Sequence, residues 1–193
     1  MYEVLAQKIS HPWKQKYAFM TDAVLVTAGS LLVALMAQIA IPLPFSPVPI
    51  TGQTFAVLLI GMVLGPKRGA LSLLLYLFEG GVGLPFFAGG RGGWAVIAGP
   101  TGGYLFGFIA AAWVVGNLAQ RGMDRNLVTA FLSFLLGSAV IYLFGVLWLS
   151  AFVGIPQAIQ AGMMPFLLGD LIKAILAGAA LPLAWRFVNK MKK

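Results

Sequence analysis

Long runs of apolar residues follow one another along most of the chain, interrupted by charged residues or by Gly and Pro. A helix that crosses a membrane needs about 20 apolar residues. Comparison of the runs with that length predicts six spans, at residues 22–41, 50–64, 69–84, 101–118, 127–153 and 165–188. The second and third spans are short, so they could be tilted or partly re-entrant. Because the runs are continuous rather than alternating, they argue against a β-barrel.

The composition supports the same class of protein. Hydrophobic residues make up 60% of the 193 residues, charged residues 9%, and the mean hydropathy is +0.93. A soluble domain carries about 25% charged residues, so this chain cannot cover a water-soluble globule. We therefore expect an all-α integral membrane protein with a single transmembrane domain. Its parts would be an N-terminal arm (1–20), a six-helix bundle (21–188) and a basic tail (189–193).

The net charge of +8 is distributed unevenly over the predicted topology. All of the 13 basic residues except Arg91 and Lys173 fall on one side of the six spans. Positive residues mark the cytoplasmic side of a membrane protein. Both termini are therefore predicted to be cytoplasmic, in a multi-pass membrane protein. The basic side would contact anionic lipid rather than nucleic acid.

Four charged residues lie elsewhere, at similar depth in the extracytoplasmic half: Glu79, Arg91, Asp170 and Lys173. An ionisable residue inside a bilayer costs at least about 2.5 kcal/mol and usually faces a cavity or a partner. Two interpretations remain open. Asp170–Lys173 and Glu79–Arg91 are ion pairs that brace the helices, or the four residues line a polar pocket that opens to the outside.

The loop at residues 84–100 favours the pocket. It is rich in glycine, which lets backbone approach a ligand closely, and it places Phe86, Phe87 and Trp94 around Arg91. Aromatic walls with a few fixed polar groups are typical of small-molecule sites. A second unusual loop, at residues 43–54, contains several prolines and should be stiff and extended; it could be a lid or a plain connector. Gln53 follows it.

The first span carries a seam of small residues with alternating spacings of four and three: Ala23, Thr27, Ser30, Ala34 and Ala37. In lipid, small residues let helices approach closely. The seam either packs inside the bundle or forms a docking surface for another membrane protein.

Catalytic chemistry is poorly represented. There is no cysteine and His11 is the single histidine, so no metal-binding set and no Ser–His nucleophile pair is predicted. The chain has no G-x-x-x-x-G-K-[ST] loop for binding ATP. We therefore predict no catalytic residues and no enzyme activity.

Several short motifs together resemble the BioY family, the biotin-specific S components of energy-coupling factor (ECF) transporters. They are VPITGQT at residues 48–54, GVGLPFF at 81–87, GGRGG at 89–93, GPTGGYL at 99–105 and GDLIK at 169–173. The last two are the most specific, and the resemblance covers residues 20–190.

The resemblance implies a six-helix substrate-binding component that takes up biotin. Such components dock onto one transmembrane coupling protein and two ATP-binding subunits, so ATP would be used by the partners and this chain would need no cofactor. Docking through small residues of the first helix implies roles for Ser30 and Ala34.

The resemblance also implies roles for the candidate pocket residues. We expect Asp170 and Lys173 on the ureido ring of biotin and Arg91 on its carboxylate, although the reverse placement of Lys173 is open. The remaining candidates are the polar residues Glu79, Gln53 and Tyr104 and the apolar walls Phe86, Phe87 and Trp94. The alternatives are an S component for another vitamin and a membrane structural subunit whose charges are only ion pairs.

Overall fold

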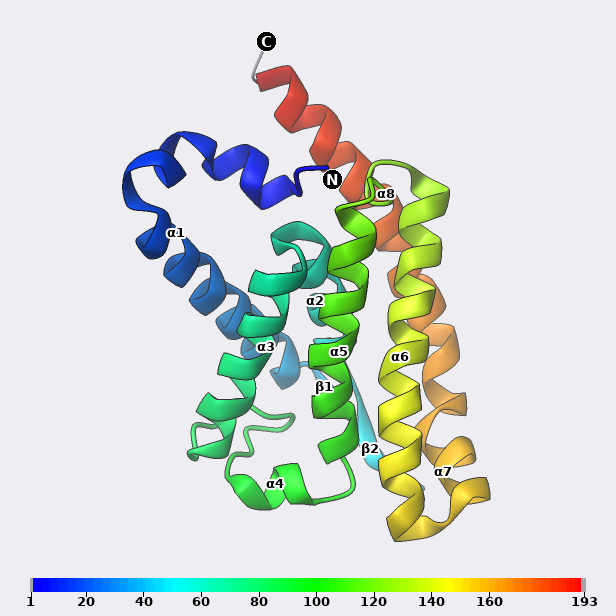
Figure 1. Ribbon diagram of the computed structural model, residues 1–193. Helices are drawn as coiled ribbons and strands as arrows, with labels where there is room; N and C mark the ends of the chain where they lie inside the picture. The colour runs from blue at the N-terminus through cyan, green and yellow to red at the C-terminus, as the bar shows by residue number, and fades with distance from the viewer. Residues whose placement is uncertain (1, 192–193) are drawn as a thin grey trace.

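The computed structural model describes residues 2–191, without the side chains of residues 10–16 and 191. It is a helical bundle with one short β-hairpin (Figure 1). The helices are α1 (Leu5–Gln38), α2 (Gln53–Leu64), α3 (Pro66–Gly81), α4 (Trp94–Ala98), α5 (Gly102–Ala119), α6 (Leu127–Val153), α7 (Ile155–Gly162) and α8 (Leu167–Met191), with a 3-10 turn at Met164–Phe166. The strands are β1 (Ala40–Leu43) and β2 (Ser46–Thr51), which pair antiparallel.

The hairpin corrects the expectation of a wholly helical fold. Pro42, Pro47 and Pro49 lie in its strands. Proline fits a two-stranded ribbon because the outer edge of each strand needs no backbone donor. The prediction that this segment is extended is confirmed, and α2 consequently begins at Gln53, three residues later than expected. The Ser46 hydroxyl donates to the Ala161 carbonyl at 2.7 Å, which fastens the hairpin to α7.

Four stretches of the described chain are long and apolar enough to cross a membrane. They are Tyr17–Gln38, Gly102–Ala119, Leu127–Val153 and Ile155–Lys190. These agree with the first, fourth, fifth and sixth predicted spans. The helices α2 and α3 have 12 and 16 residues. At 1.5 Å per residue they are about 18 and 24 Å long, which is less than the hydrocarbon core of about 30 Å.

Helix α1 consists of two parts joined by a kink at Tyr17, whose φ of −137° and ψ of 51° are not helical. The first part lies across one end of the bundle and the second descends along it (Figure 1). The backbone N–H of Tyr2 donates to the Gln120 carbonyl at 2.7 Å, so the start of the arm is tied to the end of α5.

The two ends of the bundle differ in what they contain (Figure 1). The N-terminal arm, the end of α8, the α2–α3 turn and the α5–α6 loop lie at one end, together with the basic residues of those segments. The hairpin, α4 and α7 lie at the other end. Four residues of the predicted basic side fall outside the described side chains: Lys14, Lys16, Lys192 and Lys193.

Helix α5 packs closely against its neighbours through glycine. A Cβ on Gly116 would lie 2.5 Å from the Pro66 nitrogen, and one on Gly103 would lie 2.6 Å from the Phe144 carbonyl oxygen. Small residues permit such backbone approach in a lipid environment. Helix α5 consequently lies close to α2, α3 and α6, whereas α8 packs against α6 and α2.

Candidate functional site

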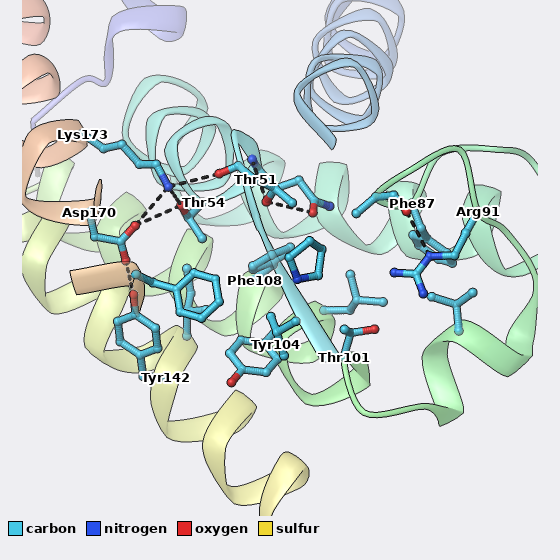
Figure 2. Close-up of a pocket in the computed structure, with 18 residues that line it drawn as sticks. Thr51, Thr54, Phe87, Arg91, Thr101, Tyr104, Phe108, Tyr142, Asp170 and Lys173 are labelled. Carbon is cyan, nitrogen blue, oxygen red and sulfur yellow. Dashed lines mark hydrogen bonds and ion pairs between the residues drawn. The ribbon is translucent and has the colours of Figure 1, made fainter. Parts of the chain in front are cut away.

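A cavity lies at the hairpin end of the bundle, between the hairpin, α2, α5, α6, α8 and the loop that follows α3 (Figure 2). It encloses about 630 Å³ of space without atoms, part of which is open to solvent. Its apolar walls are Val48, Pro49, Phe87, Ala88, Val96, Leu105, Phe108, Ile141 and Phe166. Its polar lining consists of Thr51, Gln53, Thr54, Arg91, Thr101, Tyr104, Tyr142, Asp170 and Lys173.

Asp170 lies in the first turn of α8 and is 5% exposed. One carboxylate oxygen, Oδ1, accepts hydrogen bonds from Lys173 Nζ at 3.1 Å and from Thr54 Oγ1 at 3.3 Å. The other, Oδ2, accepts a hydrogen bond from the Tyr142 hydroxyl. Both oxygens of this buried carboxylate are therefore satisfied, as a charge at this depth requires.

Lys173 lies three residues further along α8, on the same face of the helix. Its ammonium group donates to the Thr51 carbonyl at 3.1 Å, to Thr54 Oγ1 at 2.6 Å and to Asp170 Oδ1 at 3.1 Å. An ammonium has three donors, so all of them are occupied. The two interpretations of Asp170 and Lys173 are not exclusive, because these residues form an ion pair and also line the cavity (Figure 2).

Arg91 lies at the opposite end of the cavity from this ion pair (Figure 2). The loop folds back so that the Phe87 N–H donates to the Arg91 carbonyl at 2.9 Å. Gly89 and Gly90 make the turn with φ values of 72° and 70°, which side chains disfavour. Arg91 Nε donates to the Ala88 carbonyl at 3.0 Å. That bond orients the side chain, and its terminal nitrogens form no hydrogen bond with the described residues.

Three more predicted residues line the cavity, namely Gln53, Tyr104 and Phe87, and the polar atoms of the first two already have partners. Gln53 Nε2 donates to the Tyr76 hydroxyl at 2.6 Å, and Gln53 Oε1 accepts from Thr51 Oγ1 at 3.1 Å. The Tyr104 hydroxyl donates to the Gly162 carbonyl at 2.8 Å. Phe87 is buried and packs edge-on against the Tyr76 ring, with 5.5 Å between ring centroids. These residues shape and stiffen the wall.

Glu79, Phe86 and Trp94 do not line the cavity, which corrects their assignment as pocket residues. The Glu79 carboxylate accepts a hydrogen bond from the Ser30 hydroxyl, between α3 and α1. The alternative of a Glu79–Arg91 ion pair does not hold, because Glu79 binds Ser30 and Arg91 Nε donates to the Ala88 carbonyl. Phe86 packs against the core from the loop, whereas Trp94 is 60% exposed.

The family resemblance implies a docking site at two positions in the small-residue seam of α1, and the structure buries both of them. Ser30 and Ala34 are buried inside the chain, and Ser30 is bound to Glu79. In this conformation the pair offers no surface to a partner, so the intrachain alternative holds for these two positions. Ala23 and Thr27, nearer the kink, are exposed.

Two residues of the polar cluster were missed in the sequence. Tyr142 lies in the middle of the apolar run that forms α6, and Thr51 takes part through its backbone carbonyl. Tyr142 carries a signal that could have found it, because a hydroxyl within an apolar span needs a hydrogen-bond partner. The contribution of Thr51 has no such signal, since every residue has a carbonyl.

The cavity has a different polar group at each of its two ends, and apolar walls lie between them. The Asp170–Lys173 end is neutral overall and offers both donors and acceptors, which suits a polar uncharged group such as a urea or an amide. The Arg91 end offers an unpaired planar cation, which suits a carboxylate. Within the described residues no group of His, Cys, Asp or Glu is arranged to hold a metal ion.

Comparison with known proteins is consistent with this geometry. The sequence model of the BioY family matches residues 7–190. The probable biotin transporter BioY of Pyrococcus horikoshii is 45% identical over 155 residues, which cover 79% of this chain and 90% of the relative. The biotin transporter BioY of Thermotoga maritima is 42% identical over 154 residues, with coverage of 79% and 90%.

A solved structure has the same fold. It is the crystal structure of the S-component for biotin from an ECF-type ABC transporter, and it superposes with a TM-score of 0.78. The sequence identity is 25%, and the match covers 89% of this chain and 94% of that one.

Proposed function

Since the chain belongs to the BioY family, we propose that it binds biotin in the cavity at the hairpin end of the bundle and takes it up as the S component of an ECF-type transporter. The observation that carries this proposal is the pair of polar ends across an apolar cavity. Biotin has the complementary distribution, with a ureido ring at one end, a carboxylate at the other and an apolar tail between them.

The ureido ring fits the ion-paired end. Its N–H groups would donate to Asp170, and its carbonyl oxygen would accept from Lys173. All three Lys173 donors are occupied without ligand, so the carbonyl would replace one internal acceptor, for which the Thr51 carbonyl at 3.1 Å is suited. The exchange leaves Lys173 with three acceptors, so its own net contribution is small. The gain comes from the ureido N–H groups that donate to the charged Asp170 carboxylate, at about 1.5–3 kcal/mol for each hydrogen bond.

The carboxylate fits the Arg91 end. The terminal guanidinium nitrogens can bind two carboxylate oxygens side by side, and no described carboxylate competes for them. Between the two ends, Phe87, Phe108 and Ile141 present apolar surface to the aliphatic tail and the thioether ring. Glu79, Phe86 and Trp94 are left out of this assignment.

The placement of the chain in the membrane supports the same function. We propose that α2 and α3 complete six crossings as shortened spans, beside the four long ones. Both ends of the described chain lie at the same end of the bundle, as an even number of crossings requires (Figure 1). The basic residues of the α2–α3 turn and the α5–α6 loop support a cytoplasmic location for that end. The cavity then opens to the outside, where an uptake protein meets its substrate.

The partners proposed are the transmembrane coupling protein and two ATP-binding subunits of an ECF module. The chain carries no phosphate-binding loop of its own, so energy for uptake has to come from another subunit. Ser30 and Ala34 are buried, so contact through them requires the second part of α1 to move away from α3.

Calorimetric titration of the purified full-length protein with biotin and a panel of other vitamins tests the substrate. Saturable binding with biotin alone is the expected result, and mass spectrometry of the small molecule that co-purifies should find biotin. Tight binding of a different vitamin would identify an S component of another specificity. Binding of none would favour a structural subunit.

A further inference from the structure

A second hollow lies on the outer side of the cavity, between the hairpin and the glycine-rich loop. It encloses about 620 Å³ of space without atoms, part of it open to solvent. Pro49, Ala88 and Arg91 line both this hollow and the biotin cavity. The two spaces therefore adjoin at these residues, with Arg91 between them, and we call the outer one the hairpin groove.

Arg91 lies between the cavity and the hairpin groove, and its position determines which part of a ligand can enter the groove. A carboxylate held by the guanidinium lies at the boundary, with the apolar tail on the cavity side. We propose that the hairpin groove accommodates a substituent on the carboxyl carbon of the ligand, so that the protein binds biotin amides and esters of small amines and alcohols as well as free biotin. This inference rests on the proposed function and on the placement of the carboxylate at Arg91.

The chemistry of the groove suits such an extension. Its walls include Pro42, Pro47 and Ala40, and Arg91 is the one charged residue among those that line it. An amide carbonyl would still accept a hydrogen bond from the guanidinium, although the attraction between opposite charges is lost. Proline makes the hairpin stiff, so the groove is already formed before binding. Because the groove opens to solvent, a polar group at the far end of the amine stays hydrated.

A series of ligands of increasing length tests the inference by titration of the purified full-length protein. Biotin methylamide should bind about tenfold more weakly than biotin, because it lacks the negative charge. The lysine conjugate, in which biotin is linked through an amide to the lysine ε-amino group, should bind within about threefold of the methylamide. A loss of more than about thirtyfold between these two amides, with biotin still bound, would overturn the groove. Failure of biotin itself to bind would instead count against the proposed function.

A pair of neighbouring substitutions in β1 provides the matched control. Ala40 lines the groove, whereas Ile41 does not and is 60% exposed. Successive strand residues point to opposite sides, so a tryptophan fills the groove at the first position alone. Ala40→Trp should weaken the lysine conjugate at least tenfold and leave biotin within about twofold, and Ile41→Trp should change neither. Unchanged binding of the conjugate to Ala40→Trp, or an equal loss of both ligands, would contradict the proposal.

Discussion

Two aspartates are buried at opposite ends of this bundle, and they differ in what surrounds them. Asp170, at the hairpin end, is 5% exposed, is paired with Lys173 and lines a cavity. Asp124, in the α5–α6 loop, is 0% exposed. It lines neither the biotin cavity nor the hairpin groove.

The surroundings of Asp124 tie three segments together. Its Oδ2 accepts a hydrogen bond from Trp185 Nε1 of α8 at 2.6 Å, whereas Oδ1 has no hydrogen-bond partner among the described residues. The Arg125 guanidinium lies 4.3 Å from the Trp185 ring centroid and 4.6 Å from that of Tyr2. The N-terminal arm, the loop and α8 are thus held together at this end.

Burial of a charge therefore does not identify a binding site. Asp170 has the more complete set of hydrogen-bond partners and also borders a cavity. A ligand needs room as well as hydrogen bonds, so the cavity is what distinguishes this carboxylate as a binding residue. The carboxylate with an unsatisfied oxygen is enclosed by its own chain and serves to join segments. Substitutions at the Asp170 end should therefore change biotin binding, and a substitution at Asp124 should change stability.

The largest effect should come from Asp170→Asn. The change removes the charge that faces the ureido N–H groups and leaves Lys173 without its ion pair. Biotin should bind between about tenfold and a hundredfold more weakly, measured as Kd by calorimetric titration. Asp124→Asn is the matched control and should leave Kd unchanged. An unaltered affinity in Asp170→Asn would remove this residue from the site.

The next largest effect should come from Arg91→Met, which removes the cation at the other end of the cavity. Biotin should lose about tenfold in Kd, whereas biotin methylamide, which has no charge to pair, should lose less than about threefold. Arg121→Met, an exposed residue after α5, is the control. If the acid and the amide weaken equally, the carboxylate does not lie at Arg91.

A smaller effect is expected for Tyr142→Phe. The change removes the hydroxyl that donates to Asp170 Oδ2 and keeps the ring. Kd for biotin should rise about three- to fivefold. The hydroxyl acts on biotin only by orienting the charged Asp170 carboxylate, so binding loses only part of the roughly 1.5–3 kcal/mol that a hydrogen bond to a charged group contributes. Tyr104→Phe removes a hydrogen bond to the Gly162 carbonyl and leaves the ion pair intact, so its effect should be smaller still. The opposite order would mean that Tyr104 is the more important donor.

The smallest effect is expected at Asp124, where a substitution should change the pH dependence of stability and not the affinity for biotin. Burial raises the pKa of Asp124 above its ordinary value of 3.8. The folded protein then binds a proton more readily than the unfolded chain, so stability decreases as pH rises from about that value through the higher folded-state pKa.

Asp124→Asn should remove this contribution to the pH dependence. Its melting temperature, measured by thermal shift, should be less sensitive to pH above 4 than that of the parent protein, at about 2–4 °C for each kcal/mol involved. A parent protein that gains stability over this range while the variant does not would contradict the effect of burial on Asp124.

Part of the candidate site could be predicted from the sequence, and the correctly predicted residues were found for the same reason. Asp170, Lys173 and Arg91 stand out because charge is costly in an apolar segment, wherever the segment packs. The same argument selected Glu79, which instead faces α1 and binds Ser30. Depth along a helix can be counted in the sequence, but the neighbour on each face of the helix cannot.

The order of residues is enough to establish the class of protein, the positions of the long helices and the segments that carry the basic residues. A helix in lipid satisfies its own backbone hydrogen bonds, so these features need only length and apolarity. Which charges border empty space depends instead on the packing of the helices. Asp170 meets Thr54 and Tyr142 across separations of 116 and 28 residues, and such contacts depend on how whole helices pack.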